Sequence, residues 1–300
     1  MHILITGGTG FIGRALCRSL LAGGHRLTVL SRQPPERVRA SCGDGVAVLA
    51  SLRELTPQAQ FDAVVNLAGE SIAAQRWTEA RKKILWDSRV TLTAELVDRI
   101  AADEAKPAVL VSGSAVGYYG NRDDTPLNED ATPADDFSHR LCAAWEQAAL
   151  RAAECGVRVC LLRTGLVIGR DGGFLQRLLP PFRLGLGGPI GNGRQWMSWI
   201  HRDDHLALTQ YLLEHTELSG AFNATAPNPV TNAEFSRGLG RLLHRPALLP
   251  LPAPLLRLAF GEMAELLMGG QRVLPQRLLQ AGFQFRYPAL EQALAEALGR

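Results

Sequence analysis

The stretch Ile3-Leu-Ile-Thr-Gly7-Gly8-Thr9-Gly10-Phe11-Ile12-Gly13 decides the fold of this chain. A short apolar run of strand type leads into clustered glycines, and an amphipathic helical pattern follows directly. Gly8, Gly10 and Gly13 have the G-x-G-x-x-G spacing of dinucleotide-binding turns. Glycine there permits a tight turn and close approach to a pyrophosphate, whose charge the N–H groups of the helix start can hold. We therefore predict dinucleotide binding by Gly7, Thr9, Gly10, Phe11, Ile12 and Gly13.

Short apolar runs alternate with helical patterns along the chain that follows. The predicted strands are 3–5, 27–30, 46–49, 63–67, 108–111 and 157–162. Helical patterns between them include 14–22, 78–101 and 141–154. Such alternation indicates an α/β fold with a doubly wound parallel sheet of the Rossmann type, covered by helices on both faces.

The composition of the chain changes near Pro180. Residues 179–194 are rich in Gly and Pro, which is typical of a loop that serves a binding site. Pro250, Pro252 and Pro254 then open a stretch that becomes helical. We predict a dinucleotide-binding domain over residues 1–235, with a substrate-side loop at 170–200, and a small, mainly helical C-terminal domain over 246–298.

Composition narrows the class of protein. The 300 residues carry a formal net charge of +3 without a dense Lys/Arg run, so we expect neither nucleic acid nor membrane as a partner. The N-terminus has no signal-peptide pattern, and the five cysteines have no C-x-x-C spacing. We expect a cytoplasmic monomer or homodimer that acts on a small-molecule substrate.

The end of the second predicted strand carries information about the cofactor. A site specific for NAD would place Asp or Glu there to bind the ribose hydroxyls, but this chain has Ser31-Arg32. A hydroxyl and a guanidinium suit a 2′-phosphate, so we predict NADP, bound in part by Ser31 and Arg32. The alternative is that Arg32 is an ordinary solvated loop arginine.

Several longer strings carry a family resemblance. They are Thr6-Gly-Gly-Thr-Gly-Phe-Ile-Gly13, Asn66-Leu-Ala-Gly-Glu70, Ser112-Gly-Ser114, Gly117-Tyr-Tyr-Gly120, Leu162-Arg-Thr-Gly-Leu-Val167 and Trp199-Ile-His-Arg-Asp-Asp204. In this order they resemble the extended short-chain dehydrogenase/reductases of the NAD(P)-dependent epimerase/dehydratase family, and in detail its YfcH-like branch. The resemblance implies an NADP(H)-binding oxidoreductase or epimerase-like protein. It further implies cofactor contacts from Leu67, Ala68, Gly69, Arg89 and Leu166, although Arg89 could equally be an exposed salt-bridging arginine.

The chemistry of that family normally needs a serine, a tyrosine and a lysine four residues after the tyrosine. Ser114 stands in the serine position, where it would polarise a carbonyl. The Tyr-x-x-x-Lys pair is absent, because no tyrosine lies four residues before Lys82, Lys83 or Lys106. By alignment His139 takes the tyrosine position.

Three explanations of the missing pair stay open. Another acid–base group works with Ser114, the candidates being His139, Tyr118 and Tyr119. Alternatively, water or the substrate carries the proton, or catalysis is lost and the protein is a non-catalytic NADP(H)-binding sensor or regulator. Each candidate also has a purely structural interpretation, as a helix-start histidine, a strand-end hydroxyl or packed aromatic rings.

Other polar residues of the chain also have a functional and a structural interpretation. Arg183, Arg194 and Trp196 flank the glycine-rich loop and suit an anionic or sugar-like ligand, such as a nucleotide sugar, or else hold the loop. Glu146 is expected to orient a neighbouring helix or arginine, with no catalytic role. His201, Asp203 and Asp204 are too close in sequence for a closed metal site, so we predict no metal.

Overall fold

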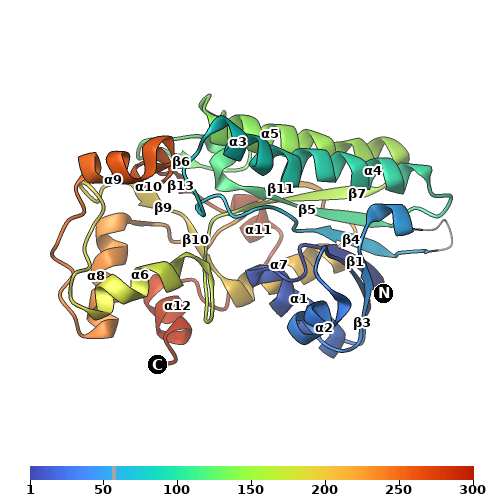
Figure 1. Ribbon diagram of the computed structural model, residues 1–300, viewed down its shortest axis with the longest axis horizontal. Coiled ribbons are helices and arrows are strands. Elements are labelled where there is room, and N and C mark those ends of the chain that lie inside the picture. Colours follow the sequence, from blue (N-terminus) through green and yellow to red (C-terminus); the bar gives the residue numbers. More distant parts are fainter. Residues whose placement is uncertain (56–58) are drawn as a thin grey trace.

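A seven-stranded parallel sheet forms the centre of the computed structural model, which describes residues 1–55 and 59–300 (Figure 1). Every neighbouring pair of strands in it is parallel. The predicted doubly wound α/β fold is thereby confirmed. In spatial order the strands are β3 (Val46–Leu49), β2 (Arg26–Leu30), β1 (His2–Thr6), β4 (Ala63–Asn66), β5 (Val109–Ala115), β7 (Arg158–Thr164) and β11 (Gly220–Ala224).

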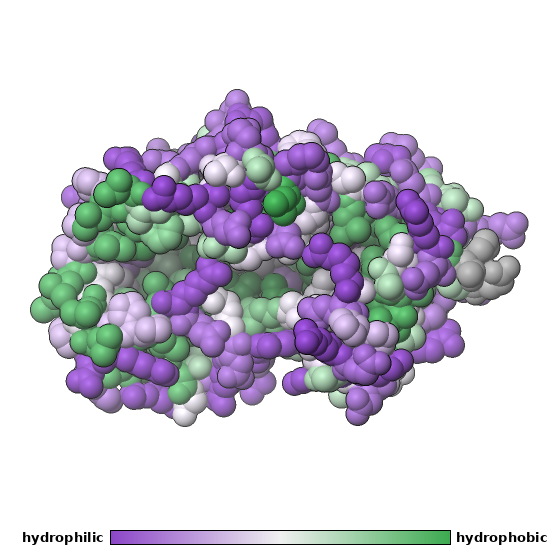
Figure 2. Space-filling view, in the orientation of Figure 1, coloured by the Kyte–Doolittle hydropathy of each residue, from purple (hydrophilic) through white to green (hydrophobic). Residues whose placement is uncertain are grey.

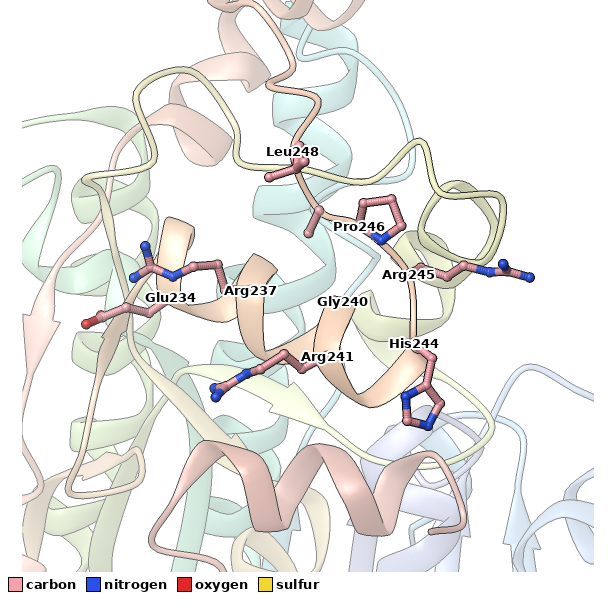
Figure 3. A pocket seen from close by; sticks show the side chains of 9 residues that line it. Glu234, Arg237, Gly240, Arg241, His244, Arg245, Pro246 and Leu248 are labelled. Carbon is pink, nitrogen blue, oxygen red and sulfur yellow. The ribbon is translucent and has the colours of Figure 1, made fainter.

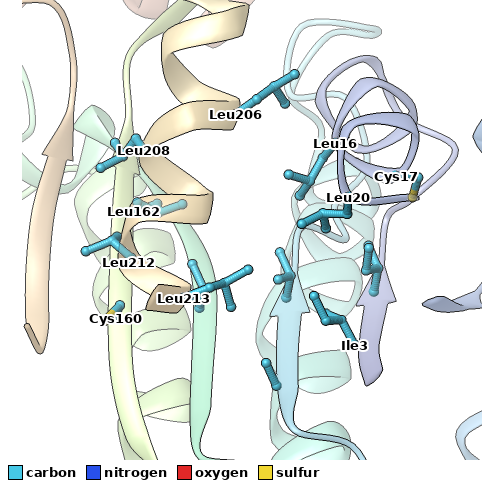
Figure 4. Close-up of a cluster of buried hydrophobic side chains, with 14 of the residues drawn as sticks. Ile3, Leu16, Cys17, Leu20, Cys160, Leu162, Leu206, Leu208, Leu212 and Leu213 are labelled. Carbon is cyan, nitrogen blue, oxygen red and sulfur yellow. The ribbon is translucent and has the colours of Figure 1, made fainter. Parts of the chain in front are cut away.

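Helices cover both faces of this sheet, as Figure 1 shows. One face carries α1 (Phe11–Ala22), α2 (Pro35–Cys42) and α7 (Arg202–Glu214); the other carries α3 (Glu79–Trp86), α4 (Leu92–Ala102) and α5 (Phe137–Leu150). Side chains of β1 alternate between two cores, because Ile3 and Ile5 pack beneath α1 and α7 (Figure 4) whereas Leu4 packs beneath α4. Strands buried on both faces explain the continuous apolar runs in the sequence.

The edge strand β11 was not predicted from the sequence. Its sequence, Gly220-Ala-Phe-Asn-Ala224, contains one large apolar side chain, and too few apolar residues to be recognised as a buried strand. Phe222 nevertheless is 1 % exposed and belongs to the core beneath α7. Pairing with β7 therefore creates a strand that the local pattern does not indicate.

The helical pattern predicted over 78–101 is present but interrupted. It consists of α3, a π-helical turn at Asp87–Thr91 and α4. A π turn contains one residue more per turn than an α-helix, so it changes which side chains face the sheet. Arg89 lies in this turn.

The substrate-side segment is more regular than the predicted loop at 170–200. Helix α6 (Gly173–Arg183) occupies its first half, and two short strands, β9 (Trp196–Met197) and β10 (Trp199–His201), lie near its end. The prediction of a loop was wrong for 173–183, because Pro180 and Pro181 fall in the last turns of the helix. Strand β10 pairs with β8 (Leu166–Ile168), and β9 pairs with β12 (Val230–Thr231).

The C-terminal residues form short helices, as predicted. Within the predicted bounds 246–298 they are α9 (Ala253–Phe260), α10 (Ala264–Met268), α11 (Gln276–Gln280) and α12 (Leu290–Ala297). Helix α8 (Asn232–Leu243) precedes these bounds, and the short strand β13 (Arg272–Val273) pairs with β6 (Pro126–Leu127). Phe182 of α6, Phe235 of α8 and Leu294 of α12 share one buried cluster. The C-terminal helices thus share a core with earlier substrate-side elements. Among the described residues no helix has the length and apolar character needed to cross a membrane.

Candidate functional site

The glycine loop between β1 and α1 is built on close backbone contacts. Gly7 has a φ of +69°, and a Cβ there would lie 2.4 Å from the carbonyl oxygen of Leu67. A Cβ on Gly13 would lie 2.2 Å from the carbonyl oxygen of Gly7. No side chain caps the start of α1 at Gly10, so the first N–H groups of the helix remain available to an anion. The loop therefore has the shape and the donors that a pyrophosphate requires.

Phe11 and Thr9 continue this loop in different ways. The Phe11 ring packs against the backbone of the segment before α6, because a Cβ on Gly172 would lie 2.4 Å from it. Thr9, Phe11 and Ile12 are half-buried. The side chain of Phe11 thereby joins the glycine loop to the substrate-side segment, which leaves its backbone as the part able to face a cofactor.

Ser31 and Arg32 follow β2 at the same edge of the sheet. Arg32 is 89 % exposed in its side chain and donates a hydrogen bond to the Glu70 carboxylate, with 3.1 Å between Nη2 and Oε1. The hydroxyl of Ser31 accepts a hydrogen bond from the backbone N–H of Gln33. An exposed guanidinium at this position is accessible to a phosphate, which would compete with Glu70 for it.

The turn after β4 lies beside the glycine loop. The backbone N–H of Ala68 donates to the Thr6 hydroxyl, which itself donates to Asn66. Leu67 and Ala68 are half-buried and Gly69 is exposed. The structure thus brings Leu67–Gly69 next to Gly7, as the prediction of a shared cofactor surface requires.

Arg89 lies behind this surface, whereas Leu166 belongs to β8 and pairs with Trp199 of β10. Arg89 donates to the backbone carbonyl oxygens of Glu70 and Leu85, and its guanidinium would be 3.0 Å from a Cβ on Gly69. Burial lowers the pKa of Arg89. The prediction that Arg89 reaches a phosphate or ribose has less support, because its N–H groups already donate to backbone carbonyl oxygens. Leu166 is half-buried, and its N–H donates to the carbonyl oxygen of Ser198.

Ser114, at the end of β5, is 4 % exposed and belongs to a buried polar network. Its hydroxyl donates to Glu146 of α5 over 2.6 Å between Oγ and Oε1. Glu146 in turn accepts two hydrogen bonds from Arg163 of β7, each with 2.9 Å between nitrogen and oxygen. Both side chains of this ion pair are 6 % exposed. The role of Ser114 in polarising a carbonyl stays a prediction, and in the structure its single hydroxyl proton is directed to Glu146.

Tyr118 and Tyr119 both contact this network, but they differ in how deeply they are buried. Tyr119 is fully buried; its hydroxyl donates to Asn223 and accepts from Arg163, and burial raises its pKa to about 12. The structure therefore does not support proton transfer to substrate by Tyr119. Tyr118 is half-buried, with its ring centroid 3.5 Å from Cζ of Arg163. Among the described residues its hydroxyl has no hydrogen-bond partner, so it is available to a ligand.

His139 stands at the start of α5, beside Tyr118. Its Nδ1 lies 2.6 Å from the Tyr118 carbonyl oxygen, and the two rings meet edge to face at 5.3 Å between centroids. Because that carbonyl can only accept, Nδ1 carries the proton and Nε2 can accept one. The structure brings Ser114, Tyr118 and His139 together around Arg163 and the start of α5.

The sequence predicts that Glu146 orients a helix or an arginine, and in the structure it pairs with Arg163. The sequence does not predict the hydrogen bond from Ser114. Thirty-two positions separate the two residues, and the signal available was a buried-face position of Glu146 within an apolar helix. A charged residue there needs partners, but the sequence does not name them.

A hollow crosses the face shown in Figure 2, between the two layers that Figure 1 places above and below it. Three contacts tie the turn after β4 and the start of α3 to later elements: Arg76 donates to the Leu258 and Ala259 carbonyl oxygens, Arg177 of α6 donates to Ala73, and Lys82 pairs with Glu262. These ties hold C-terminal elements against the dinucleotide-binding half.

Several exposed arginines lie on the substrate side, some beside the glycine-rich segment and others at a cavity near α8. Arg183 and Arg194 are exposed, and the Trp196 indole donates to Asp124. A cavity of about 620 Å³ lies at α8 and the segment after it. Figure 3 shows Arg237, Arg241 and Arg245 projecting from it in different directions, and all three are exposed. Arginines that diverge do not converge on one ligand, so we assign this cavity no function.

The described residues contain no cluster of His, Cys, Asp and Glu side chains that could hold a metal ion. Nε2 of His201 lies 3.0 Å from Glu296, and its Nδ1 accepts from the Asp203 N–H. The Asp204 carboxylate accepts the N–H groups of Arg286 and Tyr287. His201 and Asp204 thereby hold the C-terminal segment in place. Asp203 instead contacts His201 and Arg202.

Comparison with known proteins gives consistent matches. The model of the NAD dependent epimerase/dehydratase family matches residues 3–224, and that of a domain of unknown function, DUF1731, matches 251–297. The epimerase family protein Mb2239 of Mycobacterium bovis is 42 % identical, over 99 % of this chain and 98 % of that protein. The crystal structure of the human epimerase family protein SDR39U1 with NADPH has a TM-score of 0.89 and 38 % identity, with both chains covered completely. A UDP-glucuronic acid 4-epimerase from Bacillus cereus has a TM-score of 0.80 at 16 % identity, over 100 % of this chain and 98 % of that one, which shows the fold alone.

Proposed function

Since the chain belongs to the NAD dependent epimerase/dehydratase family, we propose that it is an NADP(H)-dependent oxidoreductase or epimerase-like enzyme acting on a small carbonyl or hydroxyl compound. The bound cofactor would supply hydride transfer at its nicotinamide ring. Gly7, Gly10 and Gly13 with the start of α1 would hold its pyrophosphate, and Leu67–Gly69 would lie along its adenosine side.

The observation that carries the choice of NADP is the exposed Arg32 guanidinium at the end of β2, beside the glycine loop. It stands where an NAD-specific site has a carboxylate. The similar human protein, whose crystal structure contains NADPH, supports the same cofactor. The residues of the described site fit the cofactor, because the α1 start is uncapped and no side chain fills the loop at Gly10.

For the reaction, the arrangement around Arg163 supports a substrate oxygen near Ser114 and Tyr118. Tyr118 offers a hydroxyl without a partner among the described residues, and His139 holds the backbone of Tyr118 in place. These residues would bind and orient the reacting group in place of the missing tyrosine–lysine pair. Leu166, at the start of β8, would contact the nicotinamide side, and Arg89 would support the cofactor turn from behind.

A second candidate function is a non-catalytic NADP(H)-binding sensor or regulator. The hydroxyls of Ser114 and Tyr119 are both held by buried partners, which favours this alternative. In either case we propose a small-molecule ligand and a monomer or homodimer. A cytoplasmic location stays a prediction, which the five free thiols support.

Turnover separates the two candidates. Purified protein is incubated with NADPH or NADP⁺ and a broad panel of carbonyl compounds and alcohols, and cofactor absorbance is followed. NADPH binding is measured in parallel by fluorescence. If the protein turns over any combination of cofactor and substrate, and Tyr118→Phe abolishes that turnover, the enzyme hypothesis is supported. Tight NADPH binding without turnover across the panel removes it and leaves the sensor.

A further inference from the structure

The Ser114 hydroxyl has a fixed hydrogen-bonding role. A hydroxyl carries one proton and two acceptor lone pairs. The Ser114 proton is donated to Glu146 over 2.6 Å, the length expected of a strong bond from a hydroxyl to a carboxylate. What Ser114 can still offer to a ligand is a lone pair. It is therefore an acceptor, whereas a serine that polarises a carbonyl must be a donor.

Arg163 keeps Glu146 in the form that accepts this proton. Each carboxylate oxygen of Glu146 accepts a hydrogen bond from Arg163, and such a doubly held carboxylate acts as the acceptor for Ser114. Burial alone would lower the pKa of Arg163, but the hydrogen bonds and the charge of Glu146 raise it. Turning the Ser114 proton towards a ligand would remove one charge-assisted bond from a carboxylate whose side chain is only 6 % exposed.

The frame around this pair prevents rearrangement. Ser114 and Arg163 are direct neighbours in the pairing of β5 with β7. On α5, Trp145 precedes Glu146 and packs so tightly on the sheet that a Cβ on Gly113 would lie 3.0 Å from its ring. The Trp145 indole also donates to Thr93 of α4. Glu146 is thus fixed relative to Ser114 from two elements.

From this geometry we propose that Glu146 and Arg163 are positioning residues, which hold Ser114 as a hydrogen-bond acceptor, so that the ligand group bound at Ser114 is a hydroxyl and not a carbonyl. The inference rests on the proposed function and narrows its substrate class to alcohols. It assigns Glu146 a role in substrate selection through Ser114, without contact to the substrate.

A glutamine at position 146 would reverse this preference. Its amide oxygen can still accept from Arg163, while its NH₂ group can donate to Ser114 Oγ. The Ser114 proton would then be free to reach a carbonyl oxygen. Loss of structure alone would weaken the binding of alcohols and of ketones to the same extent. The proposal requires the ratio of the two affinities to change.

The first experiment needs no ligand. In proton NMR spectra of the full chain, the short Ser114–Glu146 bond should give a downfield, slowly exchanging hydroxyl resonance. It should vanish in Ser114→Ala and in Glu146→Gln and persist in Ser112→Ala, a buried serine on the same strand that accepts from Asn66. A spectrum in which Ser114→Ala removes no such resonance would overturn the proposal.

The second experiment measures selectivity. Binding of secondary alcohols to the NADPH complex and of the matching ketones to the NADP⁺ complex is followed by fluorescence or thermal shift, with cyclohexanol and cyclohexanone, and 1-phenylethanol and acetophenone, in the panel. These complexes cannot react, so both affinities are equilibrium values. We expect the alcohol preference to fall by about tenfold or more in Glu146→Gln, the size of one charge-assisted hydrogen bond. Ser114→Thr should keep the preference and Ser114→Ala should lose it.

The outcomes separate this inference from the proposed function. Equal preference in wild type and Glu146→Gln, with turnover retained, overturns the role of Glu146 and leaves the oxidoreductase standing. If Glu146→Gln does not fold because Arg163 has lost its counter-charge, Ser114→Ala decides, since it leaves the ion pair intact. A wild-type protein that holds NADPH but neither binds nor converts any member of the panel removes both proposals.

Discussion

Arg32 is the side chain on which the proposed choice between two cofactors rests. It is the residue after Ser31 at the end of β2, and in the structure it pairs with Glu70 across the sheet edge. An exposed pair of this kind contributes little to stability, because water and salt screen it. Breaking the pair with Glu70 therefore costs little free energy, and Arg32 can turn towards a 2′-phosphate. The phosphate carries more negative charge than the carboxylate that it would replace.

Arg32→Ala should weaken NADPH binding by roughly tenfold or more and leave NADH binding nearly unchanged, because the lost charge-assisted hydrogen bonds go to the 2′-phosphate alone. Fluorescence titration of both cofactors at fixed ionic strength measures this. Arg37→Ala, an exposed arginine of α2, serves as the matched control and should affect neither cofactor selectively. Equal loss of NADPH and NADH would show that Arg32 does not recognise the phosphate.

At the scale of an element, the β1 turn and α1 depend on glycines for two different reasons. Gly13 is required by packing, since its α-carbon faces the Gly7 carbonyl, whereas Gly7 is required by its positive φ as well. Gly10 meets only the Gly7 carbonyl oxygen, at 3.2 Å from an added Cβ. That glycine thus keeps space open outside the loop.

Gly13→Ala should destabilise the protein by about 1–3 kcal/mol, because a methyl group placed against the Gly7 carbonyl must push α1 away from β1. NADPH affinity should fall with it. Thermal and urea unfolding measure the stability, and Gly45→Ala is the control, since its Cβ would meet Leu21 at an ordinary 3.4 Å. An unchanged melting temperature in Gly13→Ala would contradict this description of the loop.

The sequence predicts elements well where pattern and physics coincide. Ile3, Leu4 and Ile5 are buried on both faces, and their apolar run indicates a parallel strand directly. The local sequence does not predict strand β11, because the strand is buried by β7 and α11, which lie elsewhere in the chain. The π turn at Asp87–Thr91 is missed for the same reason, since its residues satisfy a helical pattern whichever turn they form.

In the candidate site, too, residues within one short stretch can be predicted, whereas contacts between distant elements cannot. Most of the candidate cofactor residues can be proposed from the sequence because they lie within short stretches, at Thr6–Gly13, Ser31-Arg32 and Leu67–Gly69. The network of Ser114, Glu146 and Arg163 joins a strand, a helix and another strand, so its hydrogen bonds depend on the assembled sheet. Residue types give the candidates, and only the three-dimensional arrangement gives the Ser114–Glu146 hydrogen bond on which the proposed acceptor role rests.

At the scale of the whole molecule, His205 should make stability depend on pH. It is completely buried on α7, and burial lowers its pKa from 6.5 to about 4. Below pH 6.5 the unfolded chain therefore binds a proton that the folded chain does not, so stability falls as the pH falls towards 4 and does not fall further from this group. The pKa difference corresponds to a loss of roughly 3 kcal/mol.

His205→Gln should flatten this dependence between pH 6.5 and 4. Urea unfolding of wild type and variant over that range gives the difference in slope, which isolates His205 from Glu129 and Asp204, whose pKa values burial raises. The exposed His244→Asn is the control and should keep the wild-type slope. Parallel curves for wild type and His205→Gln would refute the assignment.

The ties from Arg76 to Leu258 and Ala259, and from Lys82 to Glu262, join positions about 180 residues apart in the chain. A ribosome releases the glycine loop long before it releases the partners of Arg76 and Lys82. During synthesis the dinucleotide turn therefore leaves the ribosome while residues 258–262 have not yet been made. The contacts that close this side of the hollow can form only after the C-terminal segment follows, so this wall of the hollow is the later of the two to be supplied by the growing chain.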